Sequence, residues 1–134
     1  MIKDEDIIEV TEAFIGIANE GGALEDILRQ YQSGKSLAIK ITGTRINTGL
    51  IIKNGKLHML SHLDSPTVVV TMDKNLYWDI INAPSAAVAR TKLWVGVYTE
   101  ERILMDPPPG AHGGALHMQN LMKFFSEVST IVMG

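Results

Sequence analysis

The hydrophobic period of the chain changes from helical to two-residue near residue 36, and this change constrains the fold more than any other feature. From Leu37 to Thr42, apolar residues alternate with small or polar ones, as expected of a strand with one buried face. The alternation continues on both sides of Asn54-Gly55, a dipeptide that favours the type I′ turn of a β-hairpin. The sequence therefore predicts an antiparallel meander of four strands, at about 37–42, 45–53, 56–62 and 67–72.

Amphipathic helices are predicted on both sides of these strands. Residues 5–19 carry apolar side chains at helical spacing, and residues 24–31 repeat the pattern more briefly. Asp73 is suited to cap a helix that begins near Lys74, and Pro84 ends that helix. The last predicted helix covers residues 115–129. The predicted apolar faces are Ile7, Val10, Phe14, Ile17 and Ala18 in the first helix, and Leu76, Tyr77, Ile80 and Ile81 in the helix after Asp73.

The order of the elements indicates the fold class. After Pro84 the sequence predicts a turn or two of helix at 85–90, a strand at 92–98 and a short strand at 102–105. The whole pattern predicts one α+β domain over residues 1–134, with a largely antiparallel sheet of five to six strands. N-terminal, central and C-terminal helices are expected to cover this sheet.

Charge and composition exclude several classes of function. The net charge is −3 and the basic residues are scattered, which argues against nucleic acid as a partner. The chain has no Cys, so disulfides, thiolate nucleophiles and Cys-based zinc sites are excluded. No run approaches the roughly 20 apolar residues of a membrane-spanning helix, and the acidic N-terminus does not resemble a signal peptide. A cytoplasmic location is therefore expected.

The stretch DPPPGAHGGALH, residues 106–117, is the strongest candidate for polar chemistry. Asp106, His112 and His117 could hold a metal, but the histidines are five residues apart and no HExxH pattern is present. Gly113-Gly114 before a helix partly fits a phosphate cradle, although no GK[ST] follows. The third interpretation is a stiff loop that leads into the last helix, and it needs neither a metal nor a cofactor.

The methionines point to an apolar cavity instead. Met is flexible and polarisable, so it lines adaptable binding surfaces as well as irregular core gaps. Six methionines follow the initiator, and two lie on the predicted stripe of the last helix. They are Met59, Met72, Met105, Met118, Met122 and Met133.

The segment TVVVTMDKNLYWDIINAP, residues 67–84, resembles the sterol carrier protein type-2 family of lipid-binding domains. In that family an alternating Val/Thr strand leads into a helix with Leu and aromatic positions. A helix of small residues, similar to Ser85–Ala89, follows it, and then a Lys-apolar strand similar to Lys92–Val95. The hairpin LIIKNGKLHML and the terminal NLMKFF also fit, so the resemblance covers about residues 35–128. Where the family usually has a Gly-Asp pair, this chain reads Gly96-Val97-Tyr98, and the extra segment ERILMDPPPGAHGG follows.

This resemblance implies a non-catalytic carrier of a small apolar lipid, such as a fatty acid, an acyl chain or an isoprenoid. The ligand would lie between the sheet and the helices, in a cavity with many apolar walls. Parity along the strand places Leu50 and Ile52 on one face and Ile51 on the other. The expected lipid-binding residues are Leu50, Ile52, Met59, Val70, Met72, Trp78, Ile81, Met118, Met122 and Phe125.

Two alternatives remain open from the sequence. In the first, the apolar surface binds another protein or forms a homodimer that buries the last helix. In the second, a hydrolase or transferase uses the His112/His117 region on an acyl or phosphate substrate. A fold alone does not decide between these functions.

Overall fold

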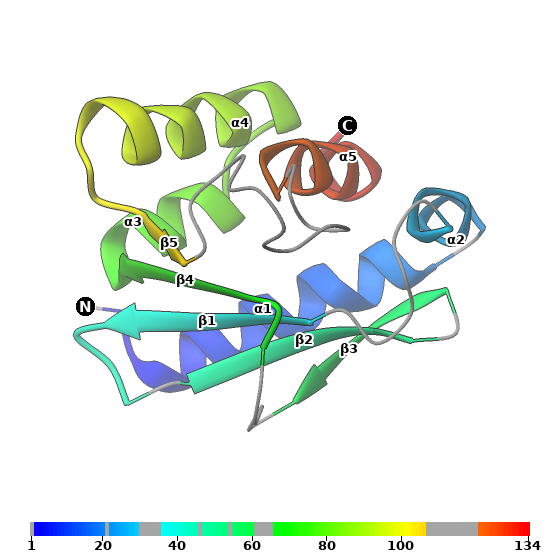
Figure 1. Ribbon diagram of the computed structural model, residues 1–134, viewed down its shortest axis with the longest axis horizontal. Coiled ribbons are helices and arrows are strands. Elements are labelled where there is room, and N and C mark those ends of the chain that lie inside the picture. The colour runs from blue at the N-terminus through cyan, green and yellow to red at the C-terminus, as the bar shows by residue number, and fades with distance from the viewer. Residues whose placement is uncertain are drawn as a thin grey trace.

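The computed structural model describes residues 2–20, 22–29, 36–45, 47–53, 55–60, 66–106 and 121–134, without the side chains at 47, 48, 60, 121 and 122. Its helices and strands follow the predicted α+β order except at residues 92–98, which are helical (Figure 1). The elements are α1 Asp4–Asn19, α2 Ala23–Leu28, β1 Ser36–Thr42, β2 Asn47–Lys53, β3 Lys56–Leu60, β4 Val68–Asp73, α3 Lys74–Ile81, α4 Ala86–Trp94, η1 Val95–Thr99, β5 Leu104–Asp106 and α5 Leu121–Met133.

The described strands form one five-stranded sheet in the order β3-β2-β1-β4-β5. The β2–β3 hairpin is confirmed by the pairing of Lys53 with Lys56, and Gly55 has the positive φ of 74° that the tight turn needs. Asn54 itself lies outside the described residues. The predicted simple meander is wrong at one point, because β4 pairs with β1 in parallel rather than with β3.

The composition of the two strands explains this parallel pairing. β4 carries valines on both faces, Val68, Val69 and Val70, which suits a central position between two neighbours. β3 presents Lys56 and His58 to solvent, which suits an edge. The sheet is therefore largely antiparallel, with one internal parallel pair.

Only one face of the sheet is buried. Along β1 and β4 the burial alternates, so that Leu37, Ile39 and Ile41 lie inside while Lys40 and Thr42 are exposed. Helices α3, α4 and α5 lie together beyond the sheet in Figure 1. Side chains from α1 join the same buried cluster as the inner strand residues and these helices. The core is thus a single layer between one sheet face and the helices.

Helix α1 packs with a stripe shifted from the predicted one. It buries Ile7, Thr11, Ile15 and Ala18, whereas Ile17 is 46% exposed. The prediction from the sequence favoured apolar residues and so passed over Thr11, whose hydroxyl is satisfied inside the protein by the carbonyl of Ile7 at 2.7 Å.

Side-chain hydrogen bonds fix the helices relative to the sheet. The side-chain amide of Asn19 donates to the carbonyl oxygen of Leu57 (2.9 Å) and accepts from the N–H of Leu57 (3.0 Å), which ties the end of α1 to the edge strand β3.

The predicted cap of α3 is confirmed, because Asp73 accepts from the N–H of Leu76 at 2.9 Å. Arg102 also donates to both Asp73 oxygens, at 2.8 and 3.1 Å. Partial burial by itself raises the pKa of Asp73. The hydrogen bonds from Leu76 and Arg102 outweigh this effect and lower the pKa below its usual value.

The predicted strand at 92–98 is wrong, because this segment is the end of α4 followed by the π-helical turn η1. Its apolar residues alternate in the sequence, which favoured a strand. The buried stripe is helical instead and is built largely from small residues: Ala86, Ala89, Leu93 and Gly96. Ala and Gly add little to a hydrophobic pattern, so the helical period of this segment could not be recognised in the sequence.

The remaining elements agree more closely with the sequence. Short β5 matches the strand expected near 102–105, and α5 continues past Ser129 to Met133. The first part of the predicted last helix, residues 115–120, lies outside the described residues. Among the described helices, none is both long and apolar enough to cross a membrane.

Two glycines allow a matched test of this packing. A Cβ at Gly96 would lie 2.7 Å from Cδ1 of Ile103 and 3.1 Å from Cδ2 of Leu76, whereas one at the exposed Gly16 would meet nothing within 4 Å. We expect Gly96→Ala to lower the free energy of unfolding by about 1–3 kcal/mol through overpacking. Gly16→Ala should raise it by about 0.5–1 kcal/mol through helix propensity. Urea denaturation measures both, and equal effects would contradict the close approach at Gly96.

Candidate functional site

A cavity of about 100 Å³ lies between the inner sheet face and the helices. Helices α1, α3, α4 and α5 and all five strands contribute to its wall. The wall surface is almost wholly carbon and sulfur, and none of its described side chains is ionised at neutral pH. The lining residues are Thr11, Phe14, Ile15, Leu37, Ile39, Leu50, Leu57, Val70, Met72, Tyr77, Ile80, Ile81, Leu93, Met105, Phe124, Phe125 and Val128.

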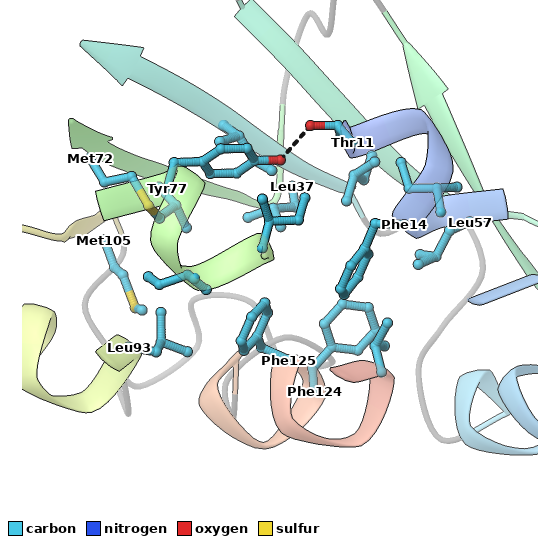
Figure 2. A pocket seen from close by; sticks show the side chains of 17 residues that line it. Thr11, Phe14, Leu37, Leu57, Met72, Tyr77, Leu93, Met105, Phe124 and Phe125 are labelled. Carbon is cyan, nitrogen blue, oxygen red and sulfur yellow. Dashed lines mark hydrogen bonds between the residues drawn. The ribbon is translucent and has the colours of Figure 1, made fainter. Parts of the chain in front are cut away.

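The wall has two chemically different ends (Figure 2). Met72 and Met105 lie at one end of the view, and Phe14 and Leu57 lie at the other. The aromatic side chains of α5 point from the opposite side toward the sheet. Helix α5 therefore acts as a cover that closes the space above the strands.

One pair of hydroxyl groups interrupts this apolar lining. Tyr77 and Thr11 hold their oxygens 2.7 Å apart, as the dashed line in Figure 2 marks. The Thr11 hydroxyl also donates to the carbonyl of Ile7. Thr11 has one proton, so both contacts are hydrogen bonds only if Tyr77 donates to Thr11. Tyr77 therefore donates to Thr11, and Thr11 donates to the carbonyl oxygen of Ile7.

The surroundings of Tyr77 keep its phenol neutral. Burial raises the pKa of Tyr77 to about 12. Ionisation would place a charge in an apolar wall with no cation among the described lining residues.

The cavity is small for a lipid. Its volume is about 100 Å³, whereas sites for drug-sized ligands span about 300–1,000 Å³. An engineered apolar cavity of about 150 Å³ already holds benzene. A long chain would therefore enter only if the wall moved.

The side chains that could move are placed around the cavity. Met72 and Met105 have several rotatable bonds and adapt to irregular shapes. The rings of Phe14 and Phe125 stack with centroids 6.5 Å apart and planes within 3°, and both are half-buried. This stack joins α1 to α5 and closes one part of the wall with side chains rather than backbone.

The structure places the predicted wall residues in three groups. Five line the cavity: Leu50, Val70, Met72, Ile81 and Phe125. Ile52 is on the inner face but buried in the core, and Met59 and Trp78 pack half-buried against the core without lining the cavity. Met118 and the side chain of Met122 lie outside the described residues.

Trp78 misses the cavity because of the rotation of α3. The helix directs its neighbours Tyr77, Ile80 and Ile81 to the lining, so Trp78 lies to the side. Leu37 and Ile39 also line the cavity but were not among the predicted wall residues. The alternation of strand residues was enough to find them, because they share a face with the other inner residues. The α1 residues that line the cavity, Thr11, Phe14 and Ile15, could not be found in this way, because the sequence does not indicate which helix crosses which strand.

The polar candidates are not assembled into a site in the described residues. Asp106 ends the edge strand β5 and is exposed. His112 and His117 lie outside the described residues, as does the Pro/Gly stretch after Asp106. Across the described part of the chain, no three His, Cys, Asp or Glu side chains are grouped as metal ligands would be.

Two solved structures resemble this chain in fold. One is a UbiJ-SCP2 ubiquinone synthesis protein, with a TM-score of 0.62 and 11% sequence identity, covering 91% of this chain and 94% of that one. The other is a conserved hypothetical protein from Thermus thermophilus, described as possibly a sterol carrier protein. It has a TM-score of 0.49 and 12% identity, covering 94% of this chain and 88% of that one. No family model and no curated protein matches the sequence. The fold expected from the resemblance to sterol carrier proteins is confirmed.

The buried phenol makes stability sensitive to alkaline pH. The unfolded chain loses the Tyr77 proton near pH 10, whereas the folded protein keeps it until about pH 12. The contribution of the neutral phenol to the free energy of unfolding is fully present below pH 10. This free energy falls by roughly 2–3 kcal/mol as the pH rises from 10 toward 12. Urea denaturation from pH 8 to 12 should show this loss in the wild type and a smaller one in Tyr77→Phe. Identical pH curves would contradict the burial of the phenol.

Proposed function

We propose that the protein binds and carries a small apolar lipid, without catalysis, in the cavity between the sheet and the helices. The observation that carries the proposal is the lining, in which seventeen side chains from nine elements converge on one space. All but Thr11 and Tyr77 are fully apolar, and those two satisfy each other. Such a wall suits a hydrocarbon and offers little to a polar metabolite.

Elementary energetics support a hydrocarbon ligand. Burial of each methylene contributes about 0.8 kcal/mol, which is roughly fourfold in affinity. The cavity must widen to accept more than a few carbons, and the methionines and the Phe14–Phe125 stack are the side chains suited to that change. The shared fold with the UbiJ-SCP2 protein adds support, and it makes an isoprenoid alcohol such as farnesol a useful probe beside fatty acids.

The alternative of a homodimer that buries the last helix has less support. Phe124, Phe125 and Val128 of α5 point into the cavity and are not free to form such an interface. On the outer side of α5, Ser126 accepts a hydrogen bond from Arg90 of α4 at 2.8 Å. The apolar side of α5 that lines the cavity is therefore engaged within the chain.

Direct identification of a ligand tests the function. Protein purified from cells under native conditions would be measured by mass spectrometry before and after denaturation. We expect a fatty acid, acyl chain or isoprenoid to be released on unfolding. Protein that is free of lipid, and that also fails to bind any added chain in titrations, would overturn the proposal.

A cavity-filling substitution tests the site. Val70 lies in the lining on the internal strand β4, and its neighbour Val69 is half-buried on the opposite face. We expect Val70→Phe to weaken binding of a fluorescent fatty acid at least tenfold, because the ring occupies the space that the ligand needs. Val69→Phe adds the same volume outside the cavity and should bind within about twofold of the wild type.

Circular dichroism and thermal melting of both variants control for folding. A larger residue in a void costs little if the void accepts it, so Val70→Phe should keep a cooperative transition within about 2 kcal/mol of the wild type. A folded Val70→Phe protein with unchanged affinity would place the ligand elsewhere.

A further inference from the structure

We propose that the outer face of α4 and η1 docks on the surface of an anionic lipid bilayer. This face, the aromatic stripe, consists of Ala87, Thr91, Trp94 and Tyr98. The inference goes beyond lipid binding in the cavity, because it gives a different surface of the molecule a partner of its own. Docking and cavity binding are therefore measured separately.

The four residues of the aromatic stripe are all exposed and lie on one side of the helix. They stand four, three and four residues apart, so the stripe runs without a break from α4 into η1. The opposite side of the same helix is the buried stripe that includes Leu93 and Gly96. A solvated helix normally carries charged residues opposite its buried side. An apolar outer face instead indicates a partner that covers it.

Trp94 and Tyr98 form the centre of the stripe. They are 49% and 54% exposed, and their ring centroids lie 5.0 Å apart with the planes tilted by 38°. Thr91 adds little polarity, because its hydroxyl donates to the carbonyl of Ala87 at 3.0 Å. Trp and Tyr combine an apolar ring with one polar group, and this combination suits the boundary between lipid headgroups and acyl chains. The pair therefore fits the interface of a bilayer.

The charge of this segment favours an anionic surface. Residues 80–99 contain no Asp or Glu, although the whole chain has a net charge of −3. They do contain Arg90, which is exposed, and Lys92, which is half-buried. Arg90 donates to the hydroxyl of Ser126 at 2.8 Å, and this neutral partner does not cancel its charge. Of the acids that follow the segment, Glu100 lies 3.6 Å from Arg102.

The acidic residues gather in a different part of the molecule. Five of them belong to α1, which packs beside the sheet, whereas α4 lies at the side of the molecule away from the sheet in Figure 1. They are Asp4, Asp6, Glu5, Glu9 and Glu12. An anionic bilayer on the aromatic stripe therefore meets the basic residues of α4 and not the acidic helix.

A second copy of the chain is a poorer occupant of the stripe. A two-fold interface places the same surface of both copies face to face. Arg90 and Lys92 of one copy would then approach Arg90 and Lys92 of the other, and like charges repel each other. A bilayer of anionic lipids offers attraction to the same residues.

The aromatic stripe lies outside one wall of the cavity. Leu93 lines the cavity and its neighbour Trp94 is exposed, so the same helix separates the cavity from the stripe. Figure 2 shows Leu93 at the same end of the cavity as Met105. A bilayer on the stripe therefore lies beyond the methionine end of the cavity, at about the thickness of one helix, roughly 10 Å.

Vesicle binding tests the inference directly. The chain has two tryptophans, so Trp78→Phe leaves Trp94 as the sole indole reporter. We expect its emission to shift to shorter wavelength when vesicles of equal parts phosphatidylcholine and phosphatidylglycerol are added. Vesicles of phosphatidylcholine alone should bind at least about fivefold more weakly, because each basic residue near an anionic surface contributes roughly that factor. Added salt should weaken binding to the mixed vesicles.

Matched substitutions separate the stripe from other exposed apolar residues. The double variant Trp94→Ala, Tyr98→Ala should lower binding to the mixed vesicles at least about tenfold in cosedimentation, because two rings no longer leave water. Ile17→Ala removes a 46% exposed side chain from α1 and should bind like the wild type. Lys92→Gln should weaken binding to the mixed vesicles by about fivefold and leave binding to phosphatidylcholine unchanged. Circular dichroism and thermal melting control for folding.

The outcomes distinguish docking from lipid binding in the cavity. Val70→Phe fills the cavity and should keep wild-type binding to vesicles, whereas the double variant should keep wild-type affinity for the fluorescent fatty acid. A wild-type protein that ignores both kinds of vesicle overturns the docking inference and leaves the proposed function standing. Vesicle binding that survives in the folded double variant, or that is lost in folded Val70→Phe, assigns it to another surface. A dimer that the double variant abolishes, without vesicle binding by the wild type, makes the stripe a protein interface and overturns the inference.

Discussion

The rest of the structure depends on a sheet that is apolar on one face only. Lysines and a histidine occupy outward positions of β1, β2 and β3, so helices are needed only on the inner side. Burial of that single face supplies the main driving force, and each helix is positioned by what it adds to the cover. The parallel β1–β4 pair extends the face to β5, where Arg102 and Asp73 join the last strand to the start of α3.

The cavity results from how this cover is assembled. Protein cores are normally packed without voids, so a space among leucines, methionines and phenylalanines lowers stability unless something fills it. Here α1 and α5 approach each other through a pair of aromatic rings, and α1 approaches α3 through a pair of hydroxyl groups. These contacts hold the helices around the space instead of collapsing them into it.

Local patterns predicted most of the elements, and most of the errors share one cause. Asp73, the β2–β3 hairpin and the alternation of β1 were readable because each depends on neighbours in the chain. The partner of β4 and the face of Trp78 depend on residues far away in sequence, and short patterns do not contain that information. Thr11 was missed because a buried hydroxyl is recognisable only once its partner is placed. The helix at 92–98 was missed because only Leu93 and Gly96 are buried in it, and the alanines that continue their stripe, Ala86 and Ala89, lie before the segment.

The contribution of α5 to the wall has a consequence for biosynthesis. A nascent chain that has reached β5 but not α5 can already form the sheet, yet Leu37, Val70 and Met105 then lack the cover that Phe124 and Val128 provide. Such an intermediate exposes an apolar trough, the kind of surface that favours aggregation and chaperone binding. If the protein binds a lipid as proposed, a lipid present at that stage would meet an open site and would be enclosed during folding, without passing the Phe14–Phe125 stack.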